Sequence, residues 1–209
     1  MTQEIANALI GYFETLYYMN RDLITLCGLD VMDNSGQYES IIKNVIQAVP
    51  RLVPYVFSKT EQKYSIDLHD GLLEYSDNLP FLKEEYEEIL RHHISVLSDI
   101  KIIRNKLEHK MHGVKLVAGG SISNTVDFDM TYMVEEKEIT LTAGDIIRLT
   151  KDINCIFATV QKAVNVYAIE KRKSDHLYYR RLLRYDFEDF NRIYDSDILG
   201  IVGKSLFPF

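Results

Sequence analysis

The chain has few cysteines and no long apolar run, and both shortages limit what it can be. Among its 209 residues only Cys27 and Cys155 are cysteines, and they lie far apart, outside any Cys-x-x-Cys or Cys-His spacing. We therefore expect no disulfide framework, but two buried thiols in a reducing compartment. No apolar run approaches the roughly 18 residues that a membrane-spanning helix requires.

Three other features are also missing from the sequence. The N-terminal segment lacks the basic start of a secretory signal and carries Glu4 and Glu14 among its apolar residues. The zinc-binding pattern His-Glu-x-x-His does not occur, and neither does an internal repeat. We therefore expect a cytoplasmic protein that uses no metal and no cofactor.

The residues that are present suit a folded domain. A hydrophobic fraction of 46% in 209 residues is ordinary for one domain with a real core. Apolar residues recur at three- and four-residue spacing in several long segments, which indicates amphipathic helices, and they alternate with polar residues in two short segments, which indicates strands. The expected helices cover 3–27, 38–49, 60–76, 81–111, 143–172 and 174–190, the hairpin strands cover 128–134 and 139–142, and residues 114–118 fit a further strand.

These elements predict an all-α fold, an up-and-down helical bundle with a small inserted β-hairpin. We expect residues 1–172 to form the bundle, with the hairpin insert at about 114–142. Residues 173–209 then supply a C-terminal helix and an apolar tail that packs on the bundle or on a dimer partner.

Charge is unevenly distributed along the chain. The net charge is −7, but residues 101–115 carry a local +4 and residues 171–184 a local +5, which leaves −16 on the remainder. Two basic islands on an acidic chain suit a confined phosphate site better than a broad DNA-binding face. The alternative is that these islands are solvated helix faces.

The first island contains the most informative motif, the hexamer Arg104-Asn105-Lys106-Leu107-Glu108-His109 near the end of the expected helix 81–111. Requiring Asn directly after Arg in an Arg-x4-His pattern lowers the expected number of chance matches to roughly 0.015. Arginine supplies a fixed cation for a phosphate, and histidine titrates near neutral pH. These are the side chains needed to cut RNA without a metal.

Helix geometry predicts that the motif works in a dimer. On an ideal helix Arg104 lies about 140° around the axis from His109 and about 7.5 Å back along it. One helix therefore does not bring both side chains to one small phosphate, whereas two copies related by a two-fold axis can form a composite cleft. In that cleft His109 acts as base or acid, Arg104 binds the phosphate, and Asn105 orients the imidazole or binds phosphate or ribose. Lys106, Lys110 and His112 supply further substrate contacts.

The hexamer resembles the Arg-Asn-x-x-x-His motif of the HEPN superfamily, with Arg104, Asn105 and His109 at the matching positions. The resemblance implies a HEPN-like helical bundle and a metal-independent endoribonuclease that acts as a homodimer. It also implies a toxin or anti-phage abortive-infection effector, with RNA as substrate and an antitoxin or a sensor protein as partner. One HEPN subclass has a tyrosine two residues after the histidine, and this chain has Met111 there, so modification by that subclass's antitoxin is not expected.

Several other interpretations stay open at this stage. Arg104 can pair with Glu108 on the same helix, which leaves a catalytically inactive adaptor or scaffold. His109 and His112 can share a metal, and of the neighbours His92 and His93 we expect one exposed and one half-buried side chain. Gly119-Gly120-Ser121 followed by Asp127 and Asp129 fits a nucleotidyltransferase poorly and is interpreted as a loop before a strand. The arginines at 180, 181 and 184, interleaved with Tyr178, Tyr179 and Tyr185, either bind single-stranded RNA or pair with Asp186, Glu188 and Asp189, and we favour the pairing.

Overall fold

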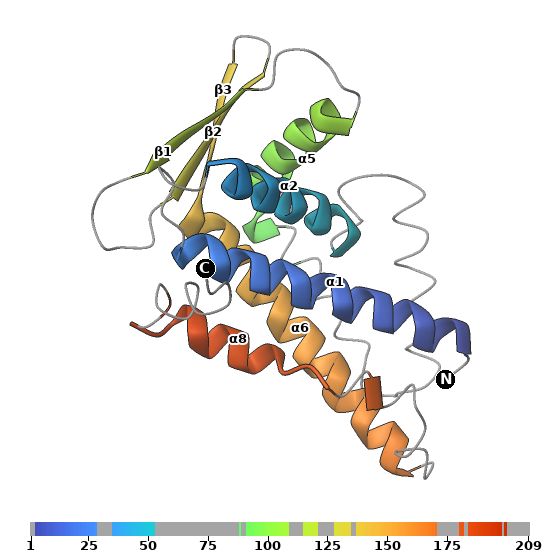
Figure 1. Cartoon of the computed structure of the whole chain (residues 1–209). Helices are drawn as coiled ribbons and strands as arrows, with labels where there is room; N and C mark the ends of the chain where they lie inside the picture. Colours follow the sequence, from blue (N-terminus) through green and yellow to red (C-terminus); the bar gives the residue numbers. More distant parts are fainter. Residues whose placement is uncertain are drawn as a thin grey trace.

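The protein is mostly helical, with one small antiparallel sheet at one end (Figure 1). The computed structural model describes residues 3–28, 35–52, 88, 91–108, 115–120, 128–134, 137–170, 180–181, 184–197 and 199. The predicted fold class, all-α with a small inserted hairpin, is confirmed within this part of the chain. The expected helix over 60–76 lies outside it.

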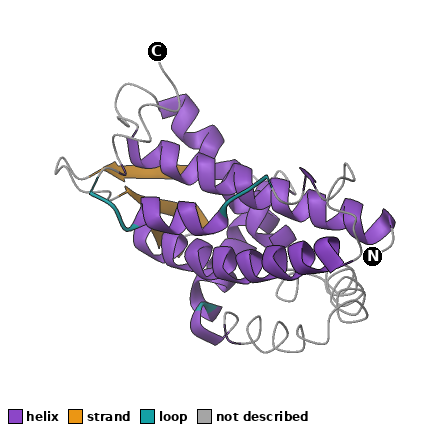
Figure 2. Ribbon diagram, turned by 90° about the horizontal axis from the view of Figure 1, so that it is seen from below, coloured by secondary structure: helices purple, strands orange, loops and turns teal. Residues whose placement is uncertain are grey.

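Five helices and three strands make up the described elements. The helices are α1 (Gln3–Gly28), α2 (Ser35–Leu52), α5 (Ile94–Glu108), α6 (Ala143–Glu170) and α8 (Phe187–Tyr194). The strands β1 (Lys115–Gly120), β2 (Phe128–Val134) and β3 (Lys137–Thr142) pair in the order β1-β2-β3, each antiparallel to its neighbour. Figure 2 shows the sheet beside the layered helices.

An aromatic cluster joins α1, α6 and α8. The ring of Phe13 on α1 meets Phe157 of α6 edge-on, with centroids 5.7 Å apart, and Phe187 of α8 at 5.3 Å. Phe13 and Phe187 are fully buried, and Phe157 is 3% exposed. Edge-to-face ring pairs add to the free energy of burial, so this cluster holds the short helix α8 against the two long ones.

A buried amide network crosses the same three helices. Asn154 of α6 exchanges two hydrogen bonds of 2.8 Å with Asn20 of α1, and its Nδ2 also donates to Oδ1 of Asn191 on α8. Asn20 and Asn154 are fully buried. Because a buried amide without partners is costly, the network favours one relative position of the three helices.

The sheet connects directly to α6. Tyr132, Ile139 and Leu141 are buried, so one face of β2 and β3 packs on the core. At the end of β3, Thr142 Oγ1 accepts a hydrogen bond from the backbone N–H of Asp145 and donates to the Asp145 carboxylate at 2.7 Å. The Thr142 hydroxyl thus caps α6, which starts where the sequence predicted it, at Ala143-Gly144-Asp145.

Three predicted boundaries differ from those observed in the first half of the chain. α2 begins at Ser35, three residues before the predicted start. α2 continues past Pro50 to Leu52, although a proline there removes one backbone hydrogen bond and crowds the carbonyl four residues earlier. The fully buried Leu52 side chain offsets this cost. The expected helix 81–111 is interrupted by a turn at His93, after which α5 begins. The Leu97 N–H still donates to the His93 carbonyl at 2.9 Å, so the apolar spacing continues through the turn and hid it from the sequence pattern.

Three further differences lie in the second half. β3 begins at Lys137, two residues earlier than predicted, and Gly119 and Gly120 pair with Asp129 and Phe128 in β1 instead of forming a loop. The single helix predicted over 174–190 is wrong, because the chain leaves helical geometry at 184–186. The Asp186 side chain then accepts from the Asp189 N–H and caps a new helix, α8.

The two cysteines are free, and only part of the prediction for them is right. Cys27 is half-buried, but Cys155 is exposed, with its Sγ accepting from Asn191 Nδ2 at 3.3 Å.

Within the described part of the chain, no helix combines the length and the apolar character needed to cross a membrane.

Candidate functional site

The described part of the Arg-Asn-x-x-x-His motif lies in the last turns of α5. Leu97, Ile100 and Ile103 are at most 1% exposed and bury one side of this helix in the core. Arg104 and Asn105 follow directly and are both half-buried. A rigid, core-anchored helix is a better support for a reacting side chain than a loop, because its position varies less.

A hydrogen bond joins the two motif residues. Arg104 Nη1 donates to Asn105 Oδ1 over 3.3 Å, although side chains of adjacent helical residues diverge by about 100°. The guanidinium has five N–H donors, and this bond uses one of them. Asn105 therefore restrains the Arg104 side chain.

The remaining motif residues are only partly described. Lys106 lies in α5, while His109, Lys110 and His112 lie outside the described residues. Their roles stay predictions, and so does the alternative pairing of Arg104 with Glu108. The two-histidine metal site falls on the same undescribed segment. Among the described residues, no three His, Cys, Asp or Glu side chains are grouped to hold a metal ion.

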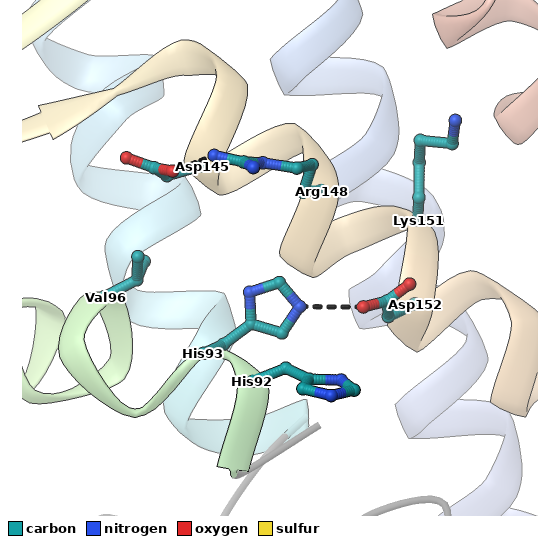
Figure 3. A pocket seen from close by; sticks show the side chains of 7 residues that line it. All are labelled: His92, His93, Val96, Asp145, Arg148, Lys151 and Asp152. Carbon is teal, nitrogen blue, oxygen red and sulfur yellow. Dashed lines mark hydrogen bonds and ion pairs between the residues drawn. The ribbon is translucent and has the colours of Figure 1, made fainter. Parts of the chain in front are cut away.

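A cleft of about 390 Å³ lies at the opposite end of α5, where that helix meets α6 (Figure 3). His93 directly precedes α5 and Arg104 follows eleven residues later, so the two are roughly 16 Å apart along the helix axis. The cleft and the motif are therefore two separate places on one helix. The lining residues are His92, His93, Val96, Asp145, Arg148, Lys151 and Asp152.

The central contact of the cleft is between His93 and Asp152. His93 Nε2 lies 2.7 Å from Asp152 Oδ2, and the imidazole is 11% exposed, whereas the carboxylate is 49% exposed. Figure 3 shows the second ring nitrogen of His93 turned away from Asp152. This arrangement fixes the ring and ties the start of α5 to α6.

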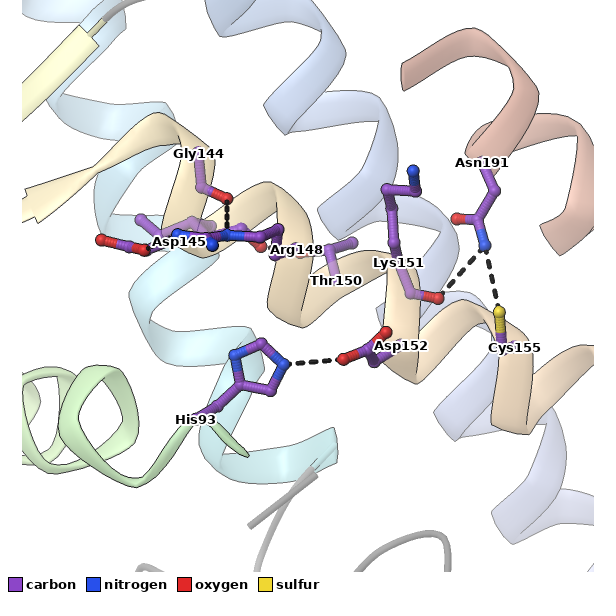
Figure 4. A network of polar contacts seen from close by, with 10 residues as sticks. His93, Gly144, Asp145, Arg148, Thr150, Lys151, Asp152, Cys155 and Asn191 are labelled. Atoms are coloured by element: carbon purple, nitrogen blue, oxygen red, sulfur yellow. Dashed lines mark hydrogen bonds and ion pairs between the residues drawn. The ribbon is translucent and has the colours of Figure 1, made fainter. Parts of the chain in front are cut away.

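The cations of the cleft are already paired with carboxylates. Arg148 Nη2 lies 2.5 Å from Asp145 Oδ1, and Lys151 Nζ lies 2.5 Å from Asp195 Oδ1. Figure 4 shows the cleft residues continuing along α6 to Cys155 and to Asn191 of α8. Arg148 and Lys151 face the carboxylates of Asp145, Asp152 and Asp195, so the cleft has no excess of positive charge and is a weak phosphate site. We assign the His93 contact to holding α5 in place.

The sequence predicted that one of His92 and His93 is exposed and the other half-buried, but it did not predict the partner of His93, Asp152. His92 is exposed and His93 is half-buried, as expected. Asp152 lies 59 residues further on and outside the apolar stripe of α6. The available sign was His93 itself, a polar residue within the apolar stripe of the expected helix 81–111, since such a position calls for a polar partner.

The arginines of the second basic island pair differently from the prediction. Arg181 and Arg184 both approach Glu14 of α1, at 2.7 and 3.6 Å. The carboxylates expected to pair with them bind elsewhere, since Glu188 pairs with Lys162 while Asp186 and Asp189 pair with Arg192. The predicted partners of Arg181 and Arg184 were wrong because Glu14, 167 residues from Arg181, reaches these arginines only through the packing of α1.

The chain matches no protein-family model, no curated protein and no solved structure.

Proposed function

We propose that the protein is a metal-independent endoribonuclease whose site is built from Arg104, Asn105 and His109. The observation that carries the proposal is the half-buried Arg104, held by Asn105 on the core-anchored helix α5, in a motif whose histidine follows five residues later. A fixed guanidinium binds a phosphate through two parallel hydrogen bonds and stabilises the charge that builds on it.

The proposed reaction needs no metal because the substrate supplies its own nucleophile. His109 accepts the proton of a ribose 2′-OH, and the 2′-oxygen attacks the adjacent phosphorus. The bond from phosphorus to the 5′-oxygen breaks, and that oxygen takes a proton from an acid. The products are a 2′,3′-cyclic phosphate and a 5′-hydroxyl. Proton transfer by a positioned group contributes roughly 10²–10⁴-fold to the rate.

The biological setting is proposed from the motif's resemblance to the HEPN superfamily. We infer a cytoplasmic toxin or anti-phage effector that acts as a homodimer and is restrained by an antitoxin or a sensor protein. Lys106, Lys110 and His112 raise the positive potential around the scissile phosphate and contact the RNA.

The test compares RNA cleavage, growth inhibition and folding in the same variants. Arg104→Ala and His109→Ala are expected to lower cleavage by orders of magnitude while the free energy of unfolding changes by about 1 kcal/mol or less. Asn105→Ala is expected to be milder, because Arg104 keeps its charge. Cleavage is expected to survive EDTA and to leave a cyclic phosphate end.

The control is Ile103→Ala, which removes a fully buried side chain one position before the motif. It is expected to cost about 2–5 kcal/mol and to lower activity only through lost folded protein. An inactive adaptor predicts the reverse pattern, in which Ile103→Ala destroys function and His109→Ala leaves it intact. Full activity in a well-folded His109→Ala protein rules out the ribonuclease.

A further inference from the structure

A second cleft, of about 420 Å³, lies between α1 and α2 (their arrangement is visible in Figure 1). Its α1 wall is a single stripe from Gly11 to Asp22, so it runs roughly 16 Å along that helix. The α2 wall is formed by Asn44, Gln47, Ala48 and Arg51. We call this cleft the α1–α2 groove.

Arginines from three separate parts of the chain surround the α1–α2 groove. Arg21 and Arg51 line it, and Arg181 and Arg184 reach its edge by binding Glu14, which also lines it. Against these four cations stand Glu14 and Asp22, so the local charge is +2 on a chain of net charge −7. The groove therefore attracts an anionic ligand that the acidic remainder of the chain repels.

The carboxylates hold these arginines without covering them. Asp22 is 6% exposed and accepts from Arg21 Nη2 at 3.3 Å and from Asn44 Nδ2 at 3.4 Å, so it forms part of the floor. The side chains of Arg181 and Arg184 remain 46% and 52% exposed beside Glu14. Each guanidinium has five N–H donors, which leaves donors for a phosphate.

An exposed aromatic ring stands in the same groove. The Tyr18 side chain is 48% exposed, and among the large apolar side chains in the described part of the chain only Ile94 is also exposed. The Arg21 guanidinium lies 4.9 Å from the Tyr18 ring centroid, and Tyr17 meets the ring edge-on. Both contacts fix the ring in place, so a base can stack on it with little loss of side-chain freedom.

We propose that the α1–α2 groove binds single-stranded RNA, with a base stacked on Tyr18 and phosphates on Arg21, Arg51, Arg181 and Arg184. Paired bases are covered on both faces inside a duplex, whereas an unpaired base offers its face to an aromatic side chain. Asn44 and Gln47 supply donors and acceptors for base edges. The choice of RNA as the ligand rests on the proposed function. The groove adds that the enzyme binds its RNA substrate as a single strand.

The experiment measures binding apart from cleavage. A fluorescent single-stranded 2′-O-methyl oligoribonucleotide lacks the attacking 2′-OH, so its anisotropy reports affinity alone. Tyr18→Ala is expected to weaken binding roughly five- to a hundredfold, and Tyr18→Phe to restore most of it. Arg51→Ala is expected to weaken binding and to reduce the slope of log affinity against log salt by about 0.7.

Arg148→Ala is the matched control, because Arg148 is 71% exposed but lines the α5–α6 cleft. It is expected to bind the strand within about twofold of wild type. A duplex of the same sequence is expected to bind more weakly than the single strand. Unchanged affinity in Tyr18→Ala, loss of binding in Tyr18→Phe, or equal affinity for the duplex overturns the proposal. Melting temperatures verify that each variant is folded.

The two proposals fail in different ways. If wild-type protein binds the strand through Tyr18 but cleaves no RNA, the α1–α2 groove stands and the ribonuclease does not. If cleavage depends on Arg104 and His109 while the groove variants bind and cleave as wild type does, the ribonuclease stands and the groove does not.

Discussion

At the scale of single residues, position decides what similar side chains do. Arg104 is half-buried and restrained by Asn105, whereas Arg148 is exposed and neutralised by Asp145. Both are arginines on core helices, but only Arg104 belongs to a motif that supplies a histidine. The imidazole of His93 likewise binds Asp152, and we assign His93 a structural role.

Two acidic groups, the half-buried Cys27 thiol and the buried Tyr194 phenol, make the folded state sensitive to alkaline pH. Burial raises the pKa of the Cys27 thiol to about 12 and raises the pKa of the Tyr194 phenol well above its usual value of 10. In the unfolded chain these groups lose their protons near pH 8.5 and 10. The unfolded state therefore binds fewer protons above pH 8.5, and the free energy of unfolding falls as pH rises.

The contributions of Cys27 and Tyr194 can be separated by the pH at which each begins to lower the free energy of unfolding. Urea titrations between pH 7 and 11 are expected to show full stability below pH 8.5 and a progressive loss above it. Cys27→Ala removes most of the loss that begins near pH 8.5, because burial also raises the pKa of the Cys155 thiol, but by less. Tyr194→Phe reduces only the part that begins near pH 10. Identical pH profiles for Cys27→Ala and wild type would contradict the assignment to Cys27.

At the scale of elements, the spacing of apolar residues predicted the helices and strands that bury one face in the core. The apolar stripes predicted α1, α2 and α6 because those helices bury one side in the core, and alternation predicted β2 and β3 because one face of the sheet is buried. α8 was missed since a capping aspartate, Asp186, ends one segment and starts the next inside a continuous apolar pattern.

The contacts around the candidate site are also of two kinds, those between neighbours in sequence and those between distant helices. Arg104 and Asn105 are adjacent in sequence, so the motif alone is enough to predict them as site residues. The contact between His93 and Asp152, and the contact of Glu14 with Arg181 and Arg184, depend on how helices far apart in sequence pack together. No local pattern contains either contact, and the α1–α2 groove could be found only in the structure.

The amide network predicts how α8 is held. Asn154→Ala removes the partner of both Asn20 and Asn191 and leaves buried polar groups without hydrogen bonds. We expect a loss of about 2–4 kcal/mol in the free energy of unfolding. Hydrogen exchange is expected to accelerate in the amides of α8 before those of α1 or α6, because the short helix is then held by the aromatic cluster and by exposed ion pairs such as Lys162 with Glu188.

The control for this prediction is another polar residue of α6. Thr159 donates to the Cys155 carbonyl one turn earlier in its own helix, and its hydroxyl has no hydrogen bond to another of the described elements. Thr159→Ala is expected to change stability by about 0.5 kcal/mol or less. If Asn154→Ala is no worse than Thr159→Ala, the network does not determine where α8 docks.

At the scale of the whole molecule, the proposed chemistry requires two copies of the chain. Arg104 and His109 of one ideal helix point about 140° apart, so we expect each site to combine Arg104 of one subunit with His109 of the partner subunit. A symmetric dimer then contains two such sites. This arrangement predicts cleavage activities of mixed dimers that are the opposite of those expected if each site lay within one chain.

Mixed dimers, isolated by coexpressing two differently tagged chains, distinguish the arrangements. Pairing an Arg104→Ala chain with a His109→Ala chain leaves one composite site intact, so about half of wild-type cleavage is expected from two inactive parents. Pairing a wild-type chain with a chain that carries both changes damages both composite sites, and no cleavage is expected. Sites confined to one chain give the opposite results, with no cleavage in the first mixed dimer and about half in the second. Because both dimers carry the same two substitutions, a difference in their activity reports only which chain supplies each side chain.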